Sequence, residues 1–95
     1  MTAYVIARVK VTDPEQYAEY TKRTPAVIAS FGGRFLARGG QTVTIEGPEA
    51  EGRIVVLEFD TLEQAVACFR SPAYAETRQF RLGAAEMQLL AVEGV

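Results

Sequence analysis

The chain contains no histidine, and only one of its 95 residues is cysteine. Without histidine, the Ser–His and Cys–His pairs of nucleophilic catalysis cannot form, and the usual ligand of zinc and iron sites is missing. The sequence has no EF-hand-like run of acidic residues, which is the pattern that would indicate a calcium site. A single cysteine cannot form an internal disulfide bond, which fits a reducing, cytoplasmic location. We therefore expect no metal site and no cofactor.

The chain also has no large excess of positive or negative charge and no long apolar stretch. Ten Lys and Arg residues against twelve Asp and Glu give a net charge of −2, which favours neither nucleic acid nor an anionic membrane as a partner. The apolar stretch near the N-terminus carries Arg8 and Lys10 and has no basic region before it. We expect neither a signal peptide nor a membrane span, and a single domain over residues 1–95.

The first half of the chain has the order strand, helix, strand. Residues 3–11 are rich in β-branched residues and predict a strand. Asp13 and Gln16 then form a capping box, and apolar residues at spacings of three and four predict a helix that ends near Gly32. We expect Pro25 to break this helix, because proline lacks an N–H group and clashes with the preceding turn.

The second half repeats this order. Residues 53–59 predict a strand, and Thr61 begins a second capping box. Ser71-Pro72 breaks the helix that follows, and residues 86–93 predict the last strand. Between the halves, an alternating pattern predicts a strand over residues 34–46 that pairs with residues 53–59 as a hairpin.

The resulting order βαββαβ predicts an α+β, ferredoxin-like fold with an antiparallel sheet of order 4-1-3-2. Both helices should cover one face of the sheet. Residues expected on the other face are Tyr4, Ile6, Arg8, Arg34, Leu36, Arg38, Ile54, Val56 and Glu58, with either Met87, Leu89 and Ala91 or Gln88, Leu90 and Val92. Such an apolar face needs a cover. A second copy of the chain provides one and gives a closed homodimer.

The stretch FGGRFLARGG, residues 31–40, places two glycine pairs around Arg34 and Arg38. A phosphate-binding loop needs the pattern GxxxxGK[ST] between a strand and a helix. Here the glycines follow a helix and precede a strand, so they shape the backbone. At Gly39-Gly40 we expect a bulge or kink.

The same stretch also carries a resemblance, together with Glu46-Gly47, the strand IVVLEF before a capped helix, the SPAY segment and the closing VEGV. These motifs resemble the small family called domain of unknown function 1330, in the dimeric α/β-barrel superfamily, over nearly the whole chain. The resemblance implies two ferredoxin-like subunits whose open sheet faces close into one barrel. It implies no established activity, because superfamily relatives include cofactor-free monooxygenases, lactone isomerases, haem-degrading enzymes and ligand-sensing domains. The absence of histidine removes the usual haem ligand.

The candidate ligand-binding residues lie between sheet and helices in this scheme; they are Arg34, Arg38, Glu58, Tyr74, Tyr20 and Phe31. Two guanidinium groups on one side of a strand suit a carboxylate or phosphate. The alternative is that both arginines pair with Glu58 or Glu46. We also expect Glu58 to pair with Arg8. This expectation takes residues 3–11 and 53–59 to be neighbouring parallel strands, with both side chains on the same face of the sheet.

Three functions fit this sequence. The first is binding of a small organic, carboxylate-bearing molecule between sheet and helices. The second is a cofactor-independent monooxygenase or isomerase reaction in which Glu58 or a tyrosine acts as base. The third is a non-catalytic dimeric scaffold. Cys68 has no histidine to activate it, and we expect it to be structural.

Overall fold

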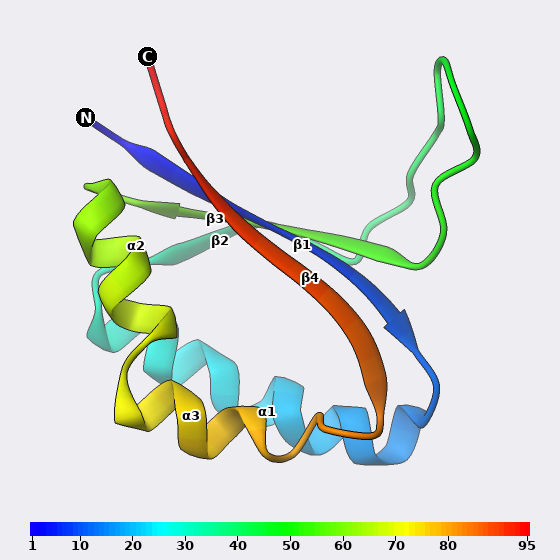
Figure 1. Ribbon diagram of the computed structural model, residues 1–95, viewed down its shortest axis with the longest axis horizontal. Coiled ribbons are helices and arrows are strands. Elements are labelled where there is room, and N and C mark those ends of the chain that lie inside the picture. Colours follow the sequence, from blue (N-terminus) through cyan, green and yellow to red (C-terminus); the bar gives the residue numbers. More distant parts are fainter.

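The computed structural model describes residues 1–95 and contains one four-stranded antiparallel sheet covered on one face by three helices (Figure 1). The elements are β1 (Ala3–Val11), α1 (Pro14–Ser30), β2 (Arg34–Arg38), β3 (Arg53–Phe59), α2 (Leu62–Phe69), α3 (Pro72–Arg78) and β4 (Ala85–Glu93). The strand order is β2-β3-β1-β4, which is the order 4-1-3-2 counted from the other edge. The ferredoxin-like fold is thus confirmed.

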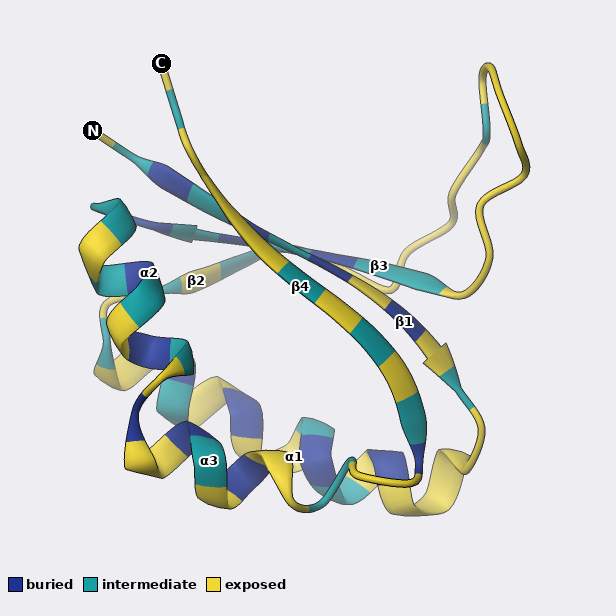
Figure 2. Ribbon diagram, in the orientation of Figure 1, coloured by how far each residue is buried: buried dark blue, intermediate teal, exposed yellow.

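The core lies between the sheet and the helices (Figure 2). Alternate residues of β1 and β3 are buried there, and the registers pair them across the strands. In β4, Met87, Leu89 and Ala91 pair with the buried residues of β1, which places Gln88, Leu90 and Val92 on the open face. The question that the sequence left open is thereby resolved.

The expected helix starts are present. The side chains of Asp13, Thr61 and Ser71 accept hydrogen bonds from backbone N–H groups three residues later, at 3.2, 3.1 and 3.1 Å. Ser71 and Pro72 separate α2 from α3, as predicted. No helix combines the length and apolar character needed to cross a membrane.

The predicted break at Pro25 is wrong, because α1 continues through it to Ser30. Pro25 has no N–H group to donate to the carbonyl oxygen of Thr21, one turn earlier. Two other donors reach that oxygen: Arg38 Nη2 at 2.7 Å and the Thr24 hydroxyl at 3.3 Å. Local and tertiary hydrogen bonds therefore replace the missing helical bond.

The predicted long second strand is also wrong: β2 ends at Arg38, and residues 39–52 form an arm without strand structure that projects from the sheet (Figure 1). Gly39 and Gly52 bound the arm with φ angles of +72° and +77°, which turn the chain away from the sheet. Val43 and Ile45 are 76% and 95% exposed on it. The alternating pattern failed as a strand signal because the arm has no neighbouring strand to pair with.

Candidate functional site

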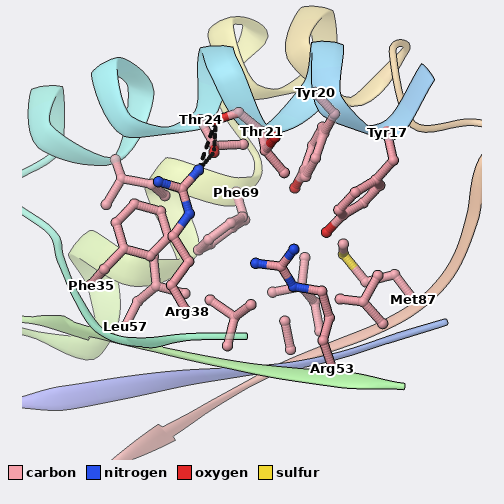
Figure 3. Close-up of a pocket in the computed structure, with 15 residues that line it drawn as sticks. Tyr17, Tyr20, Thr21, Thr24, Phe35, Arg38, Arg53, Leu57, Phe69 and Met87 are labelled. Atoms are coloured by element: carbon pink, nitrogen blue, oxygen red, sulfur yellow. Dashed lines mark hydrogen bonds between the residues drawn. The ribbon is translucent and has the colours of Figure 1, made fainter. Parts of the chain in front are cut away.

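A cavity opens between α1 and the helix-covered face of the sheet (Figure 3). Eleven of its 15 lining residues are hydrophobic. The cavity is open to solvent on one side, and its free volume is about 40 Å³. The free volume has room for about two or three water molecules. A larger ligand would therefore extend out of the cavity through its open mouth. The polar lining residues are Thr21, Thr24, Arg38 and Arg53, and none of the 15 is acidic.

Arg38 reaches this cavity because β2 contains a bulge. Phe35 pairs with Leu57 and Ala37 with Val56, so Leu36 is an extra residue that shifts the alternation. Arg38 therefore lies on the helix-covered side, whereas regular alternation would place it beside Arg34 on the open face. The expectation that both arginines share one side is wrong for this reason. The Arg38 guanidinium lies 4.5 Å from the centre of the Phe35 ring, at the mouth of the cavity.

Arg53 also lines the cavity, although the sequence did not lead us to expect it there. It begins β3, and its side chain extends from the sheet toward the tyrosines of α1 (Figure 3). The Nε atom is buried and has no hydrogen-bond partner, and the guanidinium carbon lies 5.8 Å from the centre of the Tyr17 ring. Arg53 makes no salt bridge. The alternation of side chains along β3 predicts this position, because residue 53 lies on the same face of the strand as the buried Val55 and Leu57.

Tyr17 and Tyr20 form part of the cavity wall beneath α1 (Figure 3). The Tyr20 hydroxyl lies 2.7 Å from that of Tyr74, which is buried behind it on α3. Burial raises the pKa of Tyr20 far above its ordinary value, and the neighbouring Tyr74 raises it further. Burial also raises the pKa of Tyr17, although Arg53 opposes the shift. Both phenols are therefore neutral hydrogen-bonding groups at neutral pH.

The other expected site residues lie elsewhere. Arg34 and Glu58 form an ion pair on the open face of the sheet, where Asp60 lies 3.8 Å from the same Arg34 nitrogen. Phe31 packs against the core outside the cavity lining. Of the six expected residues, only Tyr20 and Arg38 line the cavity, and Tyr74 contacts it through Tyr20.

The expected Arg8–Glu58 pair does not form. β1 and β3 are antiparallel, so Arg8 lies opposite Ile54 and Glu58 lies opposite Tyr4. Glu58 is instead neutralised by Arg34, its direct neighbour on β2. Nowhere in the chain do three or more His, Cys, Asp or Glu residues gather in a group that could hold a metal ion.

Comparison with known sequences assigns the chain to a family. The pattern described as "Domain of unknown function (DUF1330)" matches residues 2–95. The chain belongs to the DUF1330 family. Among proteins with curated descriptions, none matches this DUF1330 sequence.

Solved structures share the fold at low sequence identity. A protein of unknown function from Rhodopseudomonas palustris is 20% identical with a TM-score of 0.77, over 99% of this chain and 82% of that one. A protein described as dimeric, ferredoxin-like and of unknown function, from Jannaschia sp. CCS1, is 11% identical with a TM-score of 0.74, over 99% and 100%. SnoaB, a cofactor-independent oxygenase from Streptomyces nogalater, is 12% identical with a TM-score of 0.67, over 99% and 93%. At this low sequence identity, the similar structures show that the fold is shared and show nothing about function.

Proposed function

We propose that this protein binds a small organic molecule bearing a carboxylate in the cavity between sheet and helices, and that Arg53 and Arg38 anchor the carboxylate. The observation that carries the proposal is the Arg53 guanidinium, which enters an acid-free, largely apolar cavity with its Nε atom buried and unpaired. Arg53 is half-buried, and its buried Nε–H group without an acceptor is costly. A carboxylate ligand that accepts from this group removes that cost.

This anchor differs from the pair Arg34 and Arg38 expected from the sequence. Arg34 is already neutralised by Glu58 and Asp60 on the other face of the sheet. Arg53 and Arg38 both line one cavity that contains no acidic side chain. Guanidinium groups bind carboxylates through paired, charge-assisted hydrogen bonds.

The walls favour a ligand with an aromatic or other flat apolar part. Tyr17, Tyr20, Phe35 and Phe69 supply four aromatic rings around the two arginines. The free volume of about 40 Å³ suits the carboxylate end, and the rest of the molecule would extend toward the solvent. Benzoate is therefore a better probe than acetate.

The cofactor-independent oxygenase or isomerase alternative finds less support. SnoaB shares the fold and is described as such an enzyme. The base suggested by the sequence, Glu58, is ion-paired on the other face. The tyrosines that line the cavity have raised pKa values, which leaves them protonated at neutral pH. The observations therefore favour binding.

The proposal includes a homodimer in which two open sheet faces meet. Leu36, Leu90 and Val92 are exposed on that face, beside the half-buried Ile6 and Val56. Several solved structures of this fold are described as dimeric. A reducing, cytoplasmic location also belongs to the proposal, and it rests on the single thiol, Cys68, which is buried.

Thermal unfolding in the presence of sodium acetate or sodium benzoate tests the binding site, with sodium chloride at equal ionic strength as the reference. Benzoate at ten times its Kd stabilises the folded protein by about 1.4 kcal/mol, which raises Tm by about 5 °C or more. Acetate should give a smaller rise, because it does not contact the aromatic walls.

Arg53→Met keeps an unbranched apolar side chain that reaches as far as the Nε position and removes the guanidinium charge, so the benzoate response should disappear. Arg34→Met is the matched control on the opposite face, and it should keep the full response. If neither acid stabilises the wild type beyond sodium chloride, the protein is a scaffold without this site. Loss of the response in Arg34→Met but not in Arg53→Met would place the site on the open face instead.

A further inference from the structure

The carbonyl oxygen of Thr21 is the one acceptor in the middle of α1 that lost its helical donor to a proline. In a regular helix the N–H group of residue 25 would donate to it, and Pro25 has none. The oxygen faces the mouth of the cavity, where Arg38 Nη2 donates to it at 2.7 Å (Figure 3). The proline in the helix therefore leaves an acceptor to which a side chain of the sheet donates a hydrogen bond.

Arg38 is held at this point by three contacts. The same Nη2 atom lies 3.5 Å from the Thr24 hydroxyl oxygen, and the guanidinium lies over the Phe35 ring at 4.5 Å. No acid neutralises Arg38, and the side chain would otherwise be free to turn into solvent at the cavity mouth. Because a guanidinium has five N–H donors in a rigid fork, several remain for a ligand while one nitrogen is held by the helix.

We propose that Pro25 is a positioning residue: by withholding its N–H group, it leaves the Thr21 carbonyl free to hold Arg38 in the orientation that faces the ligand. The part of this inference that concerns affinity rests on the proposed binding function. The part that concerns the position of Arg38 stands on the protein alone.

The substitution Pro25→Ala restores the missing N–H group. The Thr21 oxygen has two lone pairs and already accepts from Arg38 and Thr24, so a third donor displaces one of them. The Thr24 hydroxyl is local to the helix, whereas Arg38 must order a long side chain to reach the site. Arg38 is therefore the group that leaves.

Two measurements on the full chain test this. In nitrogen NMR of arginine-labelled protein, with Arg38→Lys used to assign the signals, slow rotation should separate the Arg38 Nη signals in the wild type. They should merge in Pro25→Ala. The control is Ser30→Ala, which raises helix propensity in the same helix and leaves the Thr21 carbonyl untouched. Its Arg38 signals should match those of the wild type.

In calorimetric titration with benzoate, Pro25→Ala should weaken binding about tenfold, as expected for one charge-assisted hydrogen bond. Arg38→Met also removes the charge and should weaken binding at least as much, and the double variant should be no weaker than Arg38→Met alone. Ser30→Ala should bind like the wild type.

The outcomes separate this inference from the proposed function. Unchanged Arg38 signals in Pro25→Ala overturn the positioning role, whatever benzoate does. Merged signals with unchanged benzoate affinity show that Arg38 is positioned but does not serve the ligand, which overturns the affinity part. If the wild type does not bind benzoate while the signals merge as expected, the binding proposal fails and the positioning of Arg38 by Pro25 stands.

Discussion

At the scale of the residue, three arginines with the same chemistry have different surroundings: Arg34 lies on the open face of the sheet, and Arg38 and Arg53 line the cavity on the other. Arg34 has two carboxylates within reach, Arg38 has a helix carbonyl, and Arg53 has no salt bridge and a buried Nε atom without a hydrogen-bond partner. An arginine with full charge compensation contributes to packing and solubility. One without compensation in a cavity attracts an anion, and this contrast singles out Arg53.

The residue prediction that depends least on any ligand concerns Cys68, which is fully buried against the sheet. Burial raises the pKa of its thiol from 9.0 to about 11, so it should react with thiol reagents at neutral pH only as fast as the protein unfolds. Cys68→Ala should cost about 1 kcal/mol of the free energy of unfolding through lost packing. Labelling of the native protein faster than of a denatured sample would contradict a structural role.

The same shift gives a pH dependence with a definite sign. A group whose pKa is raised by folding stabilises the protein fully below its unfolded pKa, here 9.0, and this stability is lost as the pH rises through about 11. The free energy of unfolding, measured in urea, should therefore fall by about 2 kcal/mol more for the wild type than for Cys68→Ala between these pH values. Equal losses in both proteins would show that the thiol titrates normally.

At the scale of the element, one irregularity in β2 decides which side chains reach the cavity. The sequence alternates regularly through residues 34–38, and regular alternation places Arg38 on the open face. The bulge at Leu36 moves it to the helix-covered face, where α1 offers the Thr21 carbonyl. Neither the bulge nor the continuous helix through Pro25 could be foreseen, because each depends on a tertiary contact with the other element.

Deletion of Leu36 tests this reading of β2. The deletion removes the extra residue, so Arg34, Phe35, Ala37 and Arg38 should keep the faces that they now have. We expect a loss of about 1 kcal/mol in the free energy of unfolding and an intact benzoate response. Deletion of Val56 from the regular β3 is the control, and it should unfold the protein, because it turns either Arg53 or the buried half of the strand to the wrong face. If deletion of Leu36 abolishes the response in a folded protein, Arg38 has not kept its face.

At the scale of the whole molecule, the fold was predictable because its signals are local and repeated. Capping residues at Asp13, Thr61 and Ser71 begin the helices, and the alternation in β1 and β3 identifies the buried face. The candidate site was only partly predictable. Tyr20 and Arg38 were named, and Arg53 could have been found from the alternation along β3. The pairing of Arg34 with Glu58 was named as an alternative, and only the cross-strand register decides in its favour.

Dimer formation is the prediction at this scale. Light scattering after gel filtration should give about twice the chain mass of 10.4 kDa. Replacing Val92 with Glu on the open face should shift the protein toward the monomer, because a buried, unpaired carboxylate is costly. A mass of one chain for the wild type at every concentration would contradict a shared sheet interface.

The most direct test of the central claim is a crystal structure of the wild-type protein grown with benzoate. We expect electron density for a carboxylate within hydrogen-bond distance of the Arg53 guanidinium, with Arg38 beside it and the aromatic ring toward Tyr17 and Phe35. Benzoate bound at Arg34 on the open face, or an unchanged cavity at a benzoate concentration that raises Tm, would contradict it.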